Sequence, residues 1–266
     1  MALPARYPAA RWRPLGRQDE PPITPRILVV HTMVGYLRGS EDLFRRNGYR
    51  GTESHFGIGG PWDRDSDGTS LDGAVWQWQD TGRQADAQNA GNSICTSVET
   101  SDGGNPSNAW SPAQIEALTE LIVWWCRGTG HPARISTSTT MPGIGWHAQH
   151  PEWAPDGRTC PGPVRIRQLR TVVVPDAAAI LAATEATPTR PAGVRLTLTR
   201  TLALDSPMLH GEDVRAVQRA VGVTDDGWYG PATHAAVIGY QRRHRLTPDG
   251  IVGPLTAAAL GLGWSA

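Results

Sequence analysis

A stretch rich in proline, threonine and alanine divides this chain into two parts of unequal length. Residues 184–194 read TEATPTRPAGV and keep no apolar periodicity, which is typical of a linker. About 180 residues precede this stretch and about 70 follow it, so each part can bury a core of its own. The sequence therefore predicts one domain over 1–183, a linker over 184–195 and a second domain over 196–266.

The charge of the chain is balanced, and arginine carries all of its positive part. The sequence has 25 basic and 25 acidic residues, and it contains no lysine. A net charge of zero with no basic block argues against a general nucleic-acid binder and against attachment to anionic membranes. The missing lysine excludes mechanisms that need a lysine amine, such as a Schiff base.

The longer part alternates strand-like and helix-like segments. Short apolar runs rich in branched residues indicate strands, and a turn-rich segment between two such runs indicates a hairpin. Ser111 and Pro112 carry the signals of a helix start. The interleaved elements predict a mixed α/β domain, with a central and mostly β-sheet flanked by helices. The predicted elements are strands over 26–32 and 93–100, a hairpin of 54–59 and 74–80, and helices over 111–127 and 175–183.

The shorter part contains an internal repeat. The segment DGWYGPATHA, which begins at Asp226, recurs as DGIVGPLTAA from Asp249, 23 residues later. Each copy is a glycine-rich turn followed by a proline at a predicted helix start. Together with a helix over 212–221, the repeat predicts a small all-α domain of three helices.

Two histidines and one cysteine have the character of a metal site. His31 ends an apolar strand, where a side chain can be presented rigidly at the edge of a sheet. His147 lies in a segment rich in glycine and tryptophan, and Cys160 lies in a loop of proline and glycine. Two histidines and a cysteine with an open fourth position are a ligand set of catalytic zinc. Their wide spacing leaves a buried structural histidine and an inert thiol as alternatives.

Five short motifs occur in order along the longer part: VVHT at 29–32, SHFGIGG at 54–60, SVET at 97–100, GWHAQ at 145–149 and RTCPG at 158–162. Together they resemble the zinc amidases of the N-acetylmuramoyl-L-alanine amidase type 2 family, which are similar to the peptidoglycan recognition proteins. The resemblance covers roughly residues 24–175, and the C-terminal repeat resembles the type 1 peptidoglycan-binding domain.

The resemblance implies a role for each of four residues. His31, His147 and Cys160 would bind Zn²⁺, with the cysteine as a thiolate. One branch of the family uses a glutamate at the SVE position, and another has a tyrosine before the HF of the hairpin strand. This chain has Glu99 at the first place and Ser54 at the second, so the resemblance implies that Glu99 is the general base.

Arg158 is the second catalytic candidate. The family often has a lysine two residues before the third ligand, and here that residue is Arg158. An arginine cannot act as an acid or base because it does not give up its proton. It can still stabilise a developing oxyanion as a fixed positive charge.

Six further residues are predicted to contact the substrate. His55 is expected in the wall of the site or behind the ligands. In the repeat, Trp228 and Tyr229 are candidates for stacking on a sugar, with plain packing as the alternative. The six predicted contacts are Thr32, Ser54, His55, Trp146, Trp228 and Tyr229.

Two other patterns resemble metal sites. His150 lies three residues after His147 and competes with it as a ligand, although the family register favours His147. The acidic segment 63–68 resembles the start of a calcium loop, but its twelfth position is Ala74 where a glutamate is expected. We therefore interpret this segment as an acidic hairpin turn.

Two pairs of residues have competing structural interpretations. Trp76 and Trp78 share one face of a strand, and we expect them in the core rather than on a sugar platform. Cys95 and Cys126 would approach each other if the predicted helix over 111–127 packed on the predicted strand over 93–100. We expect two free thiols, because no secretory signal accompanies them.

The two resemblances point to one polymer, bacterial peptidoglycan. The first expectation is a zinc amidase that cuts the bond between the lactyl group of N-acetylmuramic acid and L-alanine, held on the wall by its C-terminal module. A peptidoglycan receptor without activity and a zinc peptidase that cuts within the stem peptide are the alternatives. The partner is the wall, with neither nucleic acid nor membrane insertion expected, and nothing suggests more than a monomer.

The place of action follows from the substrate, which lies outside the cell membrane. No apolar run approaches the ~20 residues of a membrane helix, and the first residues show no hydrophobic stretch of a secretory signal. The expectation is a phage enzyme released from the host cytoplasm at lysis, or a bacterial enzyme exported by another route.

Overall fold

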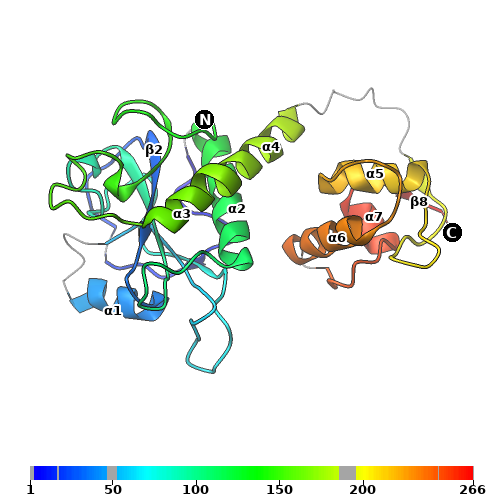
Figure 1. Cartoon of the computed structure of the whole chain (residues 1–266), viewed down its shortest axis with the longest axis horizontal. Coiled ribbons are helices and arrows are strands. Elements are labelled where there is room, and N and C mark those ends of the chain that lie inside the picture. The colour runs from blue at the N-terminus through cyan, green and yellow to red at the C-terminus, as the bar shows by residue number, and fades with distance from the viewer. Residues whose placement is uncertain (1–2, 17, 47–52, 186–195, 245, 266) are drawn as a thin grey trace. The chain divides into compact units, whose positions relative to one another are not determined.

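The structure is a computed structural model that describes residues 3–16, 18–46, 53–185, 196–244 and 246–265 (Figure 1). The chain separates into two compact units, Met1–Ala182 and Ala183–Ala266. The predicted linker lies mostly outside the described residues.

The N-terminal unit is built on one six-stranded sheet with the order β1-β4-β3-β5-β2-β6. β2 lies between β5 and β6 and pairs in parallel with both, while β3 and β4 pair antiparallel and confirm the predicted hairpin. β1 and β6 were not predicted, because β1 has two residues and β6 reads GIGW, with little of the branched character of a strand. The strands are β1 (Arg11–Trp12), β2 (Ile27–Thr32), β3 (Phe56–Ile58), β4 (Val75–Gln77), β5 (Cys95–Thr100) and β6 (Gly143–Trp146).

Helix α2 (Pro112–Thr129) begins where the sequence predicts. Ser111 accepts a hydrogen bond from the backbone of Gln114, and the Gln114 side chain bonds back to Ser111, which together form a capping box. Gly130 ends the helix in the left-handed conformation, with φ of 73°. The predicted start is confirmed, and the end lies two residues beyond the prediction.

A second helical segment follows the candidate cysteine. α3 (Pro163–Gln168), the π-helical turn η3 (Leu169–Val173) and α4 (Val174–Glu185) run on from one another (Figure 1). The predicted helix at 175–183 begins too late. Proline is common at the first position of a helix, which favoured a start at Pro175, but this proline lies inside the helical segment. The π turn ends two residues before Pro175 and changes the hydrogen-bond spacing next to a residue that cannot donate.

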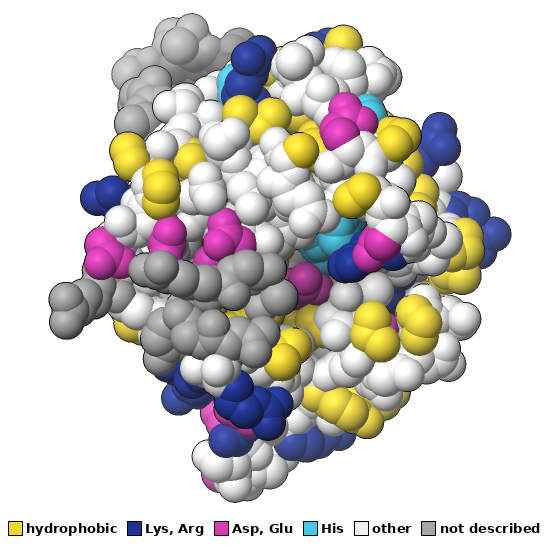
Figure 2. All heavy atoms as spheres, turned by 90° about the vertical axis from the view of Figure 1, so that its left-hand side faces the viewer, with side chains coloured by type: hydrophobic (Ala, Val, Ile, Leu, Met, Phe, Trp, Pro, Cys, Tyr) yellow, Lys and Arg dark blue, Asp and Glu magenta, His cyan; other side chains and the backbone are white. Residues whose placement is uncertain are grey.

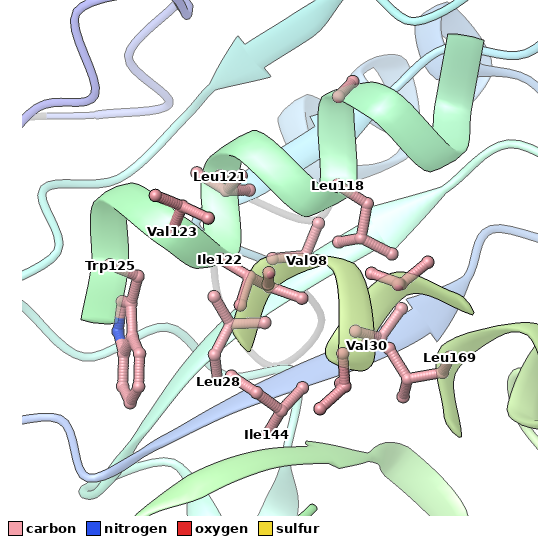
Figure 3. Packing of buried hydrophobic residues seen from close by; sticks show 14 of the residues in the cluster. Leu28, Val30, Val98, Leu118, Leu121, Ile122, Val123, Trp125, Ile144 and Leu169 are labelled. Atoms are coloured by element: carbon pink, nitrogen blue, oxygen red, sulfur yellow. The ribbon is translucent and has the colours of Figure 1, made fainter. Parts of the chain in front are cut away.

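These helices cover one face of the sheet and form the main core with it (Figure 3). Apolar side chains that alternate along β2 and β5 meet the apolar face of α2, and η3 packs beside them. The apolar face of α2 is therefore the buried one. The side chains at the centre of this core are Leu28, Val30, Val98, Leu118, Leu121, Ile122, Trp125, Ile144 and Leu169.

Helix α1 (Leu37–Arg46) belongs to a second core cluster. Its residues Leu37 and Phe44 pack with Trp76 and Trp78, which are 1% and 0% exposed. The prediction that both tryptophans belong to the core is confirmed. Gly57 permits this packing, because a Cβ atom there would lie 2.3 Å from the Trp78 ring.

The two buried cysteines near the sheet lie on opposite sides of it. Cys95 belongs to the small cluster with Ile27 and Val29, whereas Cys126 on α2 belongs to the main core. Both thiols are free, as predicted. The sheet between them excludes a disulfide.

The C-terminal unit contains the three predicted helices α5 (Glu212–Val221), α6 (Pro231–Arg243) and α7 (Pro254–Ala259). A short parallel pair, β7 (Thr197–Leu198) and β8 (Gly263–Trp264), was not predicted. It joins the beginning and the end of this unit.

The sequence repeat is also a repeat of hydrogen bonds. The Gln218 side chain donates to Asp226 at 2.8 Å and to Thr233 at 3.0 Å, and its oxygen accepts from the backbone of Gly227. One repeat later, Gln241 makes the same bonds to Asp249, Thr256 and Gly250. The aspartates are therefore turn formers in both copies, as expected for the Asp-Gly turns.

No helix in the described part of the chain is long and apolar enough to cross a membrane.

Candidate active site

The site begins with two neighbouring strands. His31 and Glu99 are direct partners in the parallel register of β2 and β5. Both point away from the main core, on the same face as Val29 and Cys95. Because the strands are parallel, their carboxyl ends meet at one edge of the sheet and bring the two side chains together.

The other candidate ligands come from β6 and from the loop before α3. β6 pairs with β2 on the side opposite β5, and His147 follows it directly in the short 3₁₀ turn η2 (His147–Gln149). The ligand atoms of His31, His147 and Cys160 all lie within 4.8 Å of one another. The structure thus brings His147 to the other two, while the His150 ring packs edge-on against Trp153.

The orientation of two of these ligands is set by the backbone. Nε2 of His147 lies 3.2 Å from the carbonyl oxygen of Trp153. This contact favours the tautomer with the proton on Nε2 and leaves Nδ1 free to bind a metal. The backbone N–H of Thr32 donates to Sγ of Cys160 at 3.2 Å, a contact that favours the thiolate.

Burial shapes the protonation of these three groups. It holds the pKa of His31 well below its usual value, and the neighbouring His147 lowers it further. Burial, followed by the positive charge of Arg158, also lowers the pKa of His147. Burial and the Glu99 carboxylate raise the pKa of the Cys160 thiol. Two neutral imidazoles are therefore ready to bind, whereas the thiolate needs a cation beside it.

Glu99 faces the same place. Its Oε1 lies 3.8 Å from Nδ1 of His31, and its Oε2 is buried and has no hydrogen-bond partner among the described residues. Burial, and next the charge of Asp102, raise the pKa of Glu99 to about 8. A buried carboxylate with a free oxygen can hold or accept a proton at the site.

Arg158 lies at the rim of the site and is paired. Its guanidinium bonds to the carboxylate of Asp156, two residues before it, and both side chains are about half exposed. The hydrogen bond with Asp156 is the main reason why the pKa of Arg158 is raised. Arg158 is nonetheless close enough to lower the pKa of Glu99 and of both histidines.

These side chains line one cleft of about 640 Å³. Figure 2 shows histidine side chains in a hollow on this face, with arginine and acidic side chains beside them. The lining includes apolar residues of α1 and of the loop before it, together with the polar side chains of the site. The residues that bear on the chemistry are His31, Thr32, Glu99, His147, Asp156, Arg158 and Cys160.

A buried network behind Thr32 had no signal in the sequence. Arg165 is fully buried and donates to the Thr32 hydroxyl at 2.9 Å, and that hydroxyl donates to Asp102 at 2.9 Å. Burial lowers the pKa of Arg165 to about 10. The network holds the residue whose N–H reaches Cys160, so it supports the third ligand from behind. It joins residues 65 or more positions apart, which no local motif indicates.

Three predicted substrate contacts lie elsewhere. His55 is fully buried, with Nδ1 against the Ser97 hydroxyl and Nε2 against the carbonyl of Arg83, and Ser54 is fully buried beside it. Trp146 packs against the main core on the other face of the sheet. The predicted contacts of Ser54, His55 and Trp146 are therefore wrong, because none of these side chains lines the cleft. Ser54 and His55 are enclosed by neighbouring residues, and Trp146 lies on the opposite face of the sheet. Thr32 does line the cleft.

The C-terminal unit separates its two predicted contacts. Trp228 is 47% exposed, lies 4.7 Å from the His210 ring and lines an open groove of about 920 Å³. Tyr229 is fully buried, and its hydroxyl donates to the Gly250 carbonyl at 2.9 Å. The predicted stacking of Tyr229 on a sugar is wrong, since this side chain ties the two copies of the repeat together.

The donor set of the cleft fits a zinc ion. Zinc prefers nitrogen and sulfur ligands in a tetrahedral arrangement, and a catalytic site supplies three of them. The described residues contain a single cluster of this kind, His31, His147 and Cys160, at the base of an open cleft. The buried oxygen of Glu99 that has no partner among the described residues lies beside this cluster and is open to a further group.

Comparison with known families agrees with this geometry. The profile of the family described as N-acetylmuramoyl-L-alanine amidase matches residues 20–163, which is more than half of the chain. The chain belongs to this family. Its N-terminal unit is an N-acetylmuramoyl-L-alanine amidase domain. The profile described as putative peptidoglycan binding domain matches residues 210–260, in the C-terminal unit.

Solved structures with similar folds carry related names. The amidase LysC from Clostridium intestinale is 15% identical, with 55% of this chain and 83% of that chain covered and a TM-score of 0.39. The Staphylococcus aureus hydrolase AmiA is 14% identical, with coverage of 69% and 89% and a TM-score of 0.49. The amidase AmiD from E. coli is 15% identical, with coverage of 92% and 90% and a TM-score of 0.39. No curated protein matches the chain.

Proposed function

We propose that this amidase hydrolyses the bond between N-acetylmuramic acid and L-alanine with a zinc ion held by His31, His147 and Cys160. The observation that carries the proposal is the meeting of these three ligand atoms within 4.8 Å, with Glu99 next to His31. Zinc would supply a Lewis acid for the scissile carbonyl. The remaining chemistry belongs to side chains of the cleft.

Glu99 is the proposed general base. Its carboxylate would take a proton from the attacking water and give it to the amine of L-alanine as the bond breaks. The positive charge of a bound ion favours the carboxylate form, against the burial that raises its pKa. Thr32 would hold the cysteine ligand through its backbone N–H.

Arg158 is the proposed stabiliser of the oxyanion. Its guanidinium lines the cleft and keeps its charge at any pH of interest. The bond to Asp156 restrains the guanidinium and offsets part of its charge. Arg158 would therefore contribute a fixed positive charge and take no part in proton transfer.

The C-terminal unit would hold the enzyme on its polymer. The exposed Trp228, beside His210, offers an aromatic surface in an open groove, which suits the face of a sugar ring. In the second copy the corresponding position is Ile251, so the aromatic surface exists in one copy alone. Attachment raises the local concentration of substrate at the catalytic unit.

The enzyme acts on the bacterial cell wall. We propose that it works as a monomer, and that it reaches the wall after release by a phage or by export from a bacterial cell. Gel filtration with light scattering measures the oligomeric state, and a dimer would contradict the first of these proposals.

The decisive experiment is a digest of purified peptidoglycan analysed by mass spectrometry. Stem peptides with a free L-alanine amine, together with intact glycan strands, are expected. Chelation should abolish their release and zinc should restore it. Fragments cut within the stem peptide would indicate a peptidase, and wall binding without new amines would indicate a receptor. Activity that survives complete chelation would contradict the role of zinc.

A further inference from the structure

The three candidate ligands differ in what lies behind them. His147 and Cys160 have backbone partners, the carbonyl of Trp153 and the N–H of Thr32. Nε2 of His31 is buried and makes no hydrogen bond of good geometry with the described residues. A ligand histidine usually gives its second N–H to an oxygen, which fixes the ring and its tautomer. His31 therefore lacks an acceptor of good geometry for its second ring nitrogen among the described residues.

Gln88 is the buried amide next to this ring. It contacts the backbone of His147, whose ring centroid lies 4.5 Å from that of His31. It is fully buried, and its Oε1 has no other partner among the described residues. An acceptor and a donor left over side by side in a buried place are expected to pair, since each is costly alone.

The same amide also reaches the second histidine. Nε2 of Gln88 donates to the carbonyl oxygen of His147 at 3.3 Å. The next residue, Asn89, donates to the carbonyl of Trp153 at 2.7 Å, which is the oxygen that also receives Nε2 of His147. The segment 88–89 thus supports His147 both at its backbone and at its ring.

The position of Gln88 is itself fixed. Its backbone N–H donates to the Asn92 side chain at 2.6 Å, and its carbonyl accepts from Gly91 at 2.9 Å. A Cβ on Gly91 would lie 2.7 Å from Cγ of Gln88. The turn therefore packs closely around the Gln88 side chain and restricts the positions that its amide can take.

We propose that Gln88 is a positioning residue that orients both histidine ligands toward one metal ion. Its oxygen accepts the Nε2 proton of His31, which leaves Nδ1 of that ring free for the ion, and its nitrogen holds the backbone of His147. The proposal rests on the proposed function in that the ion is taken to be zinc.

Three variants of the full chain test it. Gln88→Met keeps the size of the side chain and removes both polar groups, while Gln88→Glu keeps an acceptor for His31. Gln79→Met is the matched control, because Gln79 is also buried and its amide bonds to the carbonyl of Gln84, away from the cleft lining. The measurements are zinc affinity by competition with a coloured chelator, the absorption spectrum with Co²⁺, and thermal unfolding of the metal-free chain.

Gln88→Met should bind zinc about 10- to 100-fold more weakly. Gln88→Glu should lie between this variant and the wild type, and Gln79→Met should match the wild type. In the zinc-loaded wild type, NMR should show a slowly exchanging Nε2 proton on His31, and Gln88→Met should lose it. The Co²⁺ spectrum of Gln88→Met should depart from that of the wild type.

Wild-type zinc affinity in Gln88→Met would overturn the proposal, as would an equal loss in Gln79→Met or in Gln88→Glu. If Gln88→Met does not fold, Gln88→Glu decides: binding within tenfold of the wild type supports the role, and a hundredfold loss overturns it. A wild-type chain that binds no zinc would instead contradict the proposed function.

Discussion

His31 and Glu99 lie opposite each other in the parallel register of β2 and β5, with 3.8 Å between Nδ1 and Oε1. The candidate ligand and the candidate base are therefore neighbours on adjacent strands of the sheet. Because both residues are held by a buried parallel ladder, their separation does not depend on loops.

Glu99→Gln should lower the release of peptides from purified wall by about 10²- to 10⁴-fold, because an amide cannot accept the proton of the attacking water. Zinc content should stay at the wild-type level, since Glu99 is not one of the three ligands. Glu152→Gln is the control, because Glu152 is an exposed carboxylate in the same part of the chain. A variant with wild-type activity would exclude Glu99 as the base.

Cys160→Ser should reduce the zinc content and abolish activity, since a hydroxyl is a poor replacement for a thiolate ligand. Cys95→Ser serves as the control, because Cys95 is another free buried thiol but lies outside the ligand cluster. Metal analysis after dialysis measures the outcome. Retention of stoichiometric zinc by the Cys160 variant would contradict the ligand set.

Arg158→Ala should lower turnover about 10- to 100-fold, since the developing oxyanion loses a fixed positive charge. Zinc content should change little. Asp156→Asn, which frees the guanidinium from its partner, should keep or raise turnover. Arg167→Ala on α3 is an exposed control. If metal content fell in step with activity in Arg158→Ala, the oxyanion role would be wrong.

Because of His55, the free energy of unfolding of the N-terminal unit should fall as the pH falls below 6.5. Burial lowers the pKa of His55 from 6.5 to about 4, so the unfolded chain binds its proton more readily than the folded one. The stability contributed by the neutral ring is present above pH 6.5 and is lost as the pH falls toward 4. The loss over this window is about 3 kcal/mol.

His55→Gln removes this titration. Urea unfolding of metal-free wild type and variant, compared between pH 7 and pH 4, measures the difference that His55 alone makes. The variant should be less stable at pH 7 and should show a smaller loss on acidification. Parallel pH profiles of the two proteins would contradict the burial of a neutral imidazole at this position.

Trp228→Ala should weaken binding of the chain to insoluble wall about tenfold, which corresponds to ~1.4 kcal/mol. Leu255→Ala is the control, because Leu255 is 77% exposed in the second copy of the repeat. Tyr229→Phe should lower the stability of the unit without changing its affinity, as it loses the bond to Gly250. Co-sedimentation with purified wall measures both effects.

Much of the fold could be predicted because its signals are local. The cap of α2 by Ser111, the apolar run of β2 and the two Asp-Gly turns each depend on a few neighbouring residues. Elements without such a signal were missed, among them β6 and α1. Their conformation is stabilised by neighbours in the sheet and in the second core cluster, which a short window does not contain.

The amino-acid sequence by itself determined the family, the order of the motifs and the three residues that could bind zinc. Tertiary structure decided which side chains face the cleft. Trp146 and His147 are adjacent in sequence, yet one packs in the main core and the other reaches the site. The supporting residues Gln88, Asp102 and Arg165 also emerged from the fold alone. The physical reason is that a hydrogen bond between residues 59 or more positions apart leaves no periodicity in the chain, and the face of a strand is set by its partners.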